Sequence, residues 1–159
     1  MEEDFKRILV VSRVTEYCGN AVNRAILLSK KYGAELYVLL LMHNPFGLEG
    51  WNLPIASLKV LEEERKKVQK EVQDRLSAII NLERAAGLRI EEFTGWGEPL
   101  EEISEIVENE RIDLLVIPVH KKGHVEYYLF AHDRDEIVRK MPCSVLLLKQ
   151  ESDDSSTGW

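Results

Sequence analysis

Short apolar runs alternate with helical segments along almost the whole chain, and this alternation restricts the fold more than any other feature of the sequence. The runs at residues 6–12, 34–42 and 112–118 are rich in Val, Ile and Leu, as expected of strands buried on both faces. Between the first two lies GNAVNRAILLSKKYG, which has apolar residues at helical spacing and a terminating Gly33. A strand, a helix and a strand within about 40 residues imply a parallel pair joined by a right-handed crossover.

The remaining segments continue the alternation. A long helix is expected at residues 56–86, with a charged outer face and an apolar stripe of Leu58, Leu61, Val68, Val72, Leu76 and Ile79. A weaker strand at 88–93 is expected at a sheet edge, and Pro99 suits the first position of the next helix. A short helix over 133–141 and a strand over 143–149 complete the pattern.

This order predicts one α/β domain over residues 1–150. We expect a doubly wound, five-stranded parallel sheet with strand order 3-2-1-4-5 and helices on both faces. The polar residues 151–159 are predicted to be a disordered tail.

Composition excludes several classes of protein. The 159 residues are 45% hydrophobic and 31% charged, which fits a soluble globular domain. The net charge of −7 argues against general binding of nucleic acid. No signal peptide and no apolar run of the roughly 18 residues that span a bilayer is visible, so the sequence predicts a cytoplasmic protein with no membrane partner.

The two cysteines are expected to be reduced. Cys18 follows the first strand and Cys143 begins the last one, so they should lie at opposite ends of the sheet. A disulfide requires Cα atoms within about 7 Å, so we expect no bridge between them.

A ligand site in such a sheet is expected outside the carboxyl ends of the strands. The segment VIPVHKKGHVEYYLFAHDRDE, residues 116–136, begins at one of these ends. The predicted candidate residues are Ser12, Arg13, Met42, Pro118, His120, Lys121, Lys122, Gly123, Ala131 and His132.

Two segments of the C-terminal half, GEPLEEISEIVENERIDLLVIP and DEIVRKMPCSVLLLK, carry a recognisable pattern. The first is similar to the Gly-x-Pro turn, helix and strand of the universal stress protein family, and the second to its closing helix and strand, so residues 5–149 resemble this family. Gly97, Pro99, Asp113, Pro142 and Cys143 fall in register with the family pattern.

The family's nucleotide-binding branch carries a Gly-x2-Gly-x9-Gly-Ser/Thr phosphate motif, and this chain departs from it. An ungapped alignment places at its four positions Pro118, Lys121, Ala131 and His132. Arg13 replaces the aspartate that this branch has at the end of its first strand. Proline removes an amide donor and the larger residues block close backbone approach, so the resemblance implies the branch that does not bind ATP in the usual way, with no cofactor.

The resemblance also implies a homodimer through the last strand, with Val145, Leu146, Leu147 and Leu148 at its interface. These residues form an apolar edge, which favours pairing about a two-fold axis. The function implied is regulatory or protective binding of a small ligand or a protein partner.

Other interpretations remain open. Arg13, Lys121, Lys122 and Arg134 can converge to hold a nucleotide such as ATP or AMP, or another anion, by side chains. The spacing of His120, His124 and His132 invites a metal hypothesis, but it suits a site only on a helix, so we expect no metal. An enzyme of the wider nucleotide-binding α/β class is the second alternative, although no catalytic constellation is visible.

Two tryptophans lie in loops at the carboxyl ends of the strands, where the ligand site is expected. Trp51 and Trp96 follow the second and third strands. We expect both to pack against the body of the domain, and the alternative is that they line one side of a cleft.

Overall fold

A five-stranded parallel sheet forms the middle layer of the protein. The computed structural model describes residues 4–13, 18–42, 55–119 and 135–149, without the side chains of residues 55–58 and 61. Its elements are β1 Arg7–Arg13, α1 Gly19–Tyr32, β2 Glu35–Leu41, α2 Ile55–Ala85, β3 Ile90–Gly95, α3 Pro99–Asn109, β4 Leu114–Val119 and β5 Ser144–Lys149. The strand order is β3-β2-β1-β4-β5, which confirms the predicted order.

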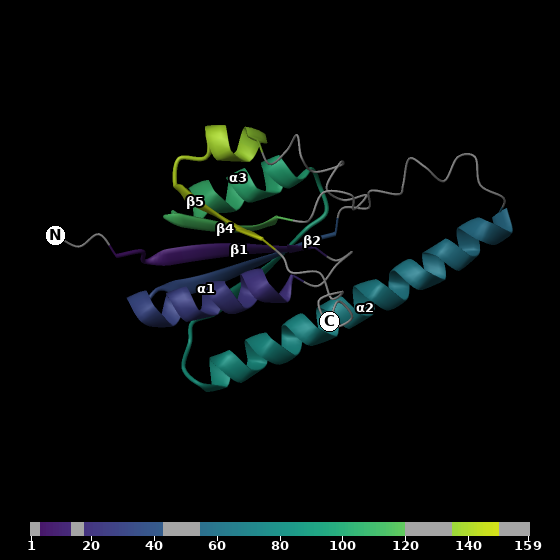
Figure 1. Ribbon diagram of the computed structural model, residues 1–159, viewed down its shortest axis with the longest axis horizontal. Coiled ribbons are helices and arrows are strands. Elements are labelled where there is room, and N and C mark those ends of the chain that lie inside the picture. The colour runs from purple at the N-terminus through teal and green to yellow at the C-terminus, as the bar shows by residue number, and fades with distance from the viewer. Residues whose placement is uncertain (1–3, 14–17, 43–54, 120–134, 150–159) are drawn as a thin grey trace, which may run out of the picture.

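Helices cover both faces of this sheet. Figure 1 shows α1 and α2 on one face, and α3 with the helical residues 135–140 on the other. Side chains alternate along each strand, so β1 contributes Ile8 and Val10 to the core beneath α1 and α2, and Leu9 and Val11 to the core beneath α3. The expected double winding is therefore present.

Local sequence signals explain where α1 and α3 begin or end. Gly33 ends α1 with a φ of 66°, a left-handed conformation that glycine adopts without steric cost. Pro99 occupies the first turn of α3, where its missing N–H is not needed, and Glu101 and Glu102 favour the positive end of the helix dipole.

The apolar stripe predicted for α2 is correct only in its second half. Val72 and Leu76 are buried and Ile79 packs partly against the same core, but Val68 is 40% exposed. Ile80, which the stripe omitted, is buried. Leu58 and Leu61 lie outside the described side chains. The stripe fails at Val68 because the first half of α2 extends beyond the sheet and has no sheet surface to pack against (Figure 1).

The amino ends of the strands are joined by polar contacts. The Asp113 carboxylate accepts hydrogen bonds from the backbone N–H groups of Lys6 at 2.8 Å and Arg7 at 3.1 Å. The Arg7 guanidinium donates to the Glu110 carbonyl at 2.7 Å. These contacts join β1 to the loop that precedes β4, so the two central strands are fixed at this end.

Neither Cys18 nor Cys143 forms a disulfide, and the two residues lie near opposite edges of the sheet. Cys18 is buried at the start of α1, and Cys143 directly precedes β5. The predicted tail at 151–159 lies outside the described residues. Among the helices of the described ranges, none is both long enough and apolar enough to cross a bilayer.

Candidate functional site

The two central strands separate at their carboxyl ends. β1 and β4 pair only through Ile8–Leu114, Leu9–Leu115 and Val10–Val116. On their other sides, β1 stays paired with β2 as far as Arg13, and β4 stays paired with β5 as far as Val119. The gap therefore opens between the two strands at which the strand order reverses, which is the expected place for a ligand in this fold.

Pro118 lies at the level of this gap. If the β1–β4 register continued, Ser12 would be opposite Pro118. Pro118 has no N–H to offer to a neighbouring strand or to a ligand, and its side chain is fully buried. Proline is uncommon in interior strands for this reason. The predicted loss of one backbone donor therefore lies in the gap beyond the last β1–β4 pair. This gap between the carboxyl ends of β1 and β4, at Ser12 and Pro118, is the mouth of the sheet.

Ser12 is the second unusual residue at the mouth. Its side chain is completely buried, and its Oγ has no hydrogen-bond partner among the residues that the structure describes. A buried hydroxyl without a partner costs free energy, so such a group usually has a specific reason to be present. Strand alternation places Ser12 on the same face of the sheet as Val10, the face covered by α1 and α2.

Met42 completes the described part of the predicted site. It belongs to the core beneath α1 and α2, and its N–H donates to the Gly95 carbonyl at 2.8 Å. Strand alternation also places Pro118 on this face. The structure therefore brings Ser12, Met42 and Pro118 to one face of one edge, while Arg13 projects half-buried from the last position of β1.

The rest of the predicted site lies outside the described residues. This group comprises His120, Lys121, Lys122, Gly123, His124, Ala131, His132 and Arg134. The convergence of cationic side chains, the histidine arrangement and the substituted glycine positions remain predictions. Among the described residues, no group of His, Cys, Asp and Glu is arranged to hold a metal ion.

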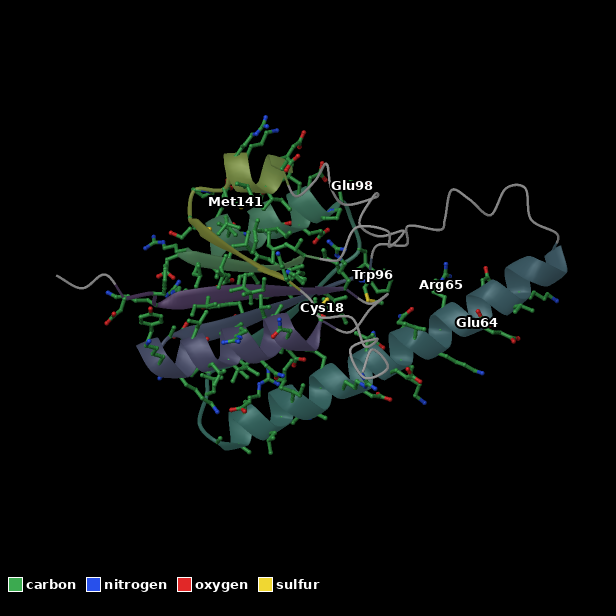
Figure 2. All side chains as sticks on the ribbon, in the orientation of Figure 1. Cys18, Glu64, Arg65, Trp96, Glu98 and Met141 are labelled. Carbon is green, nitrogen blue, oxygen red and sulfur yellow. The ribbon has the colours of Figure 1, made fainter. Side chains whose placement is uncertain are left out.

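The expected packing of Trp96 is wrong. Its side chain is 72% exposed at the carboxyl end of β3. Figure 2 shows Trp96 at the same edge of the sheet as Cys18, which is the edge that carries the mouth. Gly95 and Gly97 on either side of Trp96 lie against the Glu102 carboxylate, and the Gly97 N–H donates to it at 3.1 Å. Trp51 lies outside the described residues.

Two polar contacts at this edge were not predicted. The Asn20 side-chain amide donates to the Lys149 carbonyl at 2.8 Å, which joins the start of α1 to the end of β5. Glu102 binds the turn before its own helix. The glutamates in the first turn of α3 give a sequence signal for the second contact, whereas the first depends on a pairing of distant segments.

Shifted pKa values lie at the opposite edge of the sheet. A hydrogen bond from the Tyr37 hydroxyl, at 2.9 Å, lowers the pKa of Glu35. Burial, together with the hydrogen bond to Glu35, raises the pKa of Tyr37 to about 12. Burial raises the pKa of the Cys143 thiol, which favours its unreactive protonated form. These groups lie far from the carboxyl ends of β1 and β4. The described groups there are the Ser12 hydroxyl and the backbone of Pro118, which has no N–H.

The chain is similar to a known protein family over most of its length. The model of the universal stress protein family matches residues 4–149 of this chain. A universal stress protein of Methanocaldococcus jannaschii is 27% identical over 154 residues, covering 94% of this chain and 85% of that protein.

Solved structures share the fold at low sequence identity. UspA from Lactobacillus plantarum superposes with a TM-score of 0.66 at 16% identity, over 92% of this chain and 99% of that one. A universal stress protein family protein from Arabidopsis thaliana, solved with AMP bound, superposes with a TM-score of 0.55 at 16% identity, over 94% of each chain.

Proposed function

The chain belongs to the universal stress protein family, and we propose that it is a stress-response binding module whose mouth does not hold ATP in the family's usual pose. The single observation that carries this proposal is the gap between β1 and β4, with Pro118 buried beside it and unable to donate an amide hydrogen. The module would act by binding a ligand or a protein partner, without chemical turnover and without a resident cofactor.

The sequence supports the same proposal at four further positions. Lys121 and Ala131 stand where the phosphate motif has glycines, and His132 stands where it has a hydroxyl. Cradling a triphosphate requires several backbone N–H groups at close approach, and side chains at these positions prevent that approach. Arg13 cannot accept a hydrogen bond from a ribose hydroxyl, because a guanidinium has only donors.

A second candidate function is the binding of a smaller anionic ligand by side chains. The unpartnered Ser12 Oγ favours it, because a hydroxyl buried at the mouth offers a donor and an acceptor to a bound molecule. The Arabidopsis relative was solved with AMP, and a monophosphate needs fewer backbone donors than a triphosphate. In this pose Arg13 and Lys121 or Lys122 would supply the positive charge.

Mass spectrometry of the purified protein under non-denaturing conditions tests both candidates. Calorimetry with AMP, ADP and cyclic AMP then measures the affinity of the protein for each nucleotide. Saturable AMP binding that is lost in Arg13→Ala would establish the second candidate. A nucleoside triphosphate that co-purifies at one molecule per chain would contradict the first, and measurable ATP hydrolysis would establish an enzyme.

We also propose a homodimer through β5, in the cytoplasm. β5 is an edge strand, and its apolar residues are incompletely covered: Leu147 is 43% exposed, and Val145, Leu146 and Leu148 are half-buried. An exposed apolar edge favours pairing with a second copy of the chain. Light scattering at low protein concentration and high salt, where weak ionic contacts do not persist, should give twice the chain mass of 18.4 kDa, and Leu147→Lys should give the monomer mass under the same conditions. A monomeric wild-type protein at high concentration would contradict this assembly.

A further inference from the structure

The two halves of α2 have different surroundings. In the second half, Val72, Leu76 and Ile80 are buried, Glu83 pairs with Lys30 at 2.6 Å, and Arg84 pairs with Glu92 at 3.0 Å. In residues 59–71, no described side chain is buried. A helix of this length spans about 46 Å, whereas a seven-residue strand spans about 23 Å, so roughly half of α2 extends beyond the sheet (Figure 1).

The projecting half carries charges that have no partner in the described structure. Glu62, Glu63 and Glu64 are followed directly by Arg65, Lys66 and Lys67. None of these six side chains makes an ion pair with another described residue. Figure 2 shows Glu64 and Arg65 on the part of α2 that lies beyond the sheet. A free helix of about 15 residues is only marginally stable in water, so contacts along this half would stabilise it.

One face of the projecting half is complementary to itself. Val60, Glu64, Lys67 and Glu71 recur at intervals of four, three and four residues, so they lie on one side of the helix, and all four are exposed. If two copies pack antiparallel about a two-fold axis midway between Glu64 and Lys67, each Glu64 faces Lys67 of the other copy. In parallel packing Glu64 would face Glu64, which is repulsive.

We propose that this face of α2, defined by Val60, Glu64, Lys67 and Glu71, is an interaction surface for a second copy of the same chain in antiparallel orientation. The reciprocal pairs fix the orientation, and Val60 packs against the aliphatic stem of Glu71 in the other copy. Exposed ion pairs contribute little each and the contact is shorter than that of a permanent dimer, so the association is weak and sensitive to salt. The surface is separate from the mouth and from β5, so it does not depend on the function proposed above.

Charge exchange at two positions tests the surface. Sedimentation equilibrium should show an average mass that rises with concentration for the wild type. Glu64→Lys and Lys67→Glu should each weaken this association by roughly tenfold, because attraction becomes repulsion twice per interface. The double variant Glu64→Lys/Lys67→Glu, and the equimolar mixture of the two single variants, should both recover it. Circular dichroism checks that each variant is folded.

Cysteine cross-linking tests the orientation. A mixture of Glu64→Cys and Lys67→Cys proteins should form a mixed disulfide faster than either protein alone, whereas a parallel contact would favour Glu64→Cys with itself. The same measurements on the Leu147→Lys background separate this association from pairing through β5, because the α2 contact should persist when β5 cannot pair. If the double variant does not recover association, or if the wild-type mass is independent of concentration, the proposal is wrong.

Discussion

The amino ends and the carboxyl ends of the strands form the amino edge and the carboxyl edge of the sheet. These two edges differ in the hydrogen bonds that their polar groups make. At the amino edge, several polar groups bond to one another: Asp113 accepts two backbone N–H groups, Arg7 donates to the Glu110 carbonyl, and Glu35 accepts from Tyr37, although the buried Ser29 Oγ of α1 near this edge has no partner among the described residues. At the carboxyl edge, β1 and β4 separate, and the buried Ser12 hydroxyl on the strand itself has no partner among the described residues. The difference indicates that the amino edge contributes stability, while the carboxyl edge leaves hydrogen-bonding capacity for another molecule.

The largest effect is expected where the amino edge is most connected. Asp113→Ala should lower the free energy of unfolding by about 2 kcal/mol, because two N–H groups lose a charged acceptor. Urea denaturation measures the change. Asp113→Asn is the matched control and should lose about half as much, because the amide keeps one oxygen acceptor. A loss below about 0.5 kcal/mol for Asp113→Ala would show that this edge is not a source of stability.

A smaller effect is expected from Tyr37, and it should depend on pH. The pKa of Tyr37 is raised from 10.0 to about 12 in the folded protein, so the folded state holds this proton more tightly than the unfolded state. The resulting stabilisation is complete below pH 10 and is lost as the pH rises toward 12. Tyr37→Phe should lose about 1 kcal/mol at neutral pH through the missing hydrogen bond to Glu35.

Stability curves in urea between pH 8 and pH 12 compare the two proteins. The wild type should lose more stability than Tyr37→Phe across this range. Equal slopes would show that the Tyr37–Glu35 contact does not hold the phenol proton.

The smallest change is expected at the mouth. Ser12→Ala removes a hydroxyl that has no partner in the described part of the chain, so the free energy of unfolding should stay within about 0.5 kcal/mol of the wild type or rise slightly. Thermal unfolding of the ligand-free protein is the measurement. A loss of more than about 1 kcal/mol would mean that Ser12 is bonded within the protein, and the contrast between the two edges would disappear.

The sequence predicted the sheet well because strand burial and helix caps are local signals. The apolar runs in β1, β2 and β4, together with Gly33 and Pro99, defined the elements, and crossover handedness then restricted their order. The sequence was wrong about Val68 and Trp96, because exposure depends on which neighbour covers a residue. Periodicity shows which side of a helix is apolar, but not how far the sheet extends beneath it.

The candidate site was predicted less completely than the fold. Ser12, Met42 and Pro118 lie at the carboxyl ends of neighbouring strands, which share one edge of the sheet, but their role as a ligand site stays a prediction. The separation of β1 from β4 was not predicted, because it depends on pairing between distant segments. Pro118 gave a partial signal, as proline lacks the amide that a shared register would use.

Isothermal titration of the wild-type protein with magnesium ATP tests the central claim most directly. The mouth of β4 offers no amide at Pro118, so we predict no saturable heat at nucleotide concentrations up to about 1 mM, which corresponds to a binding free energy weaker than about −4 kcal/mol. A variant with Pro118→Gly, Lys121→Gly, Ala131→Gly and His132→Ser should bind ATP more tightly than the wild type. Stoichiometric binding of ATP to the wild type with a micromolar Kd would contradict the claim.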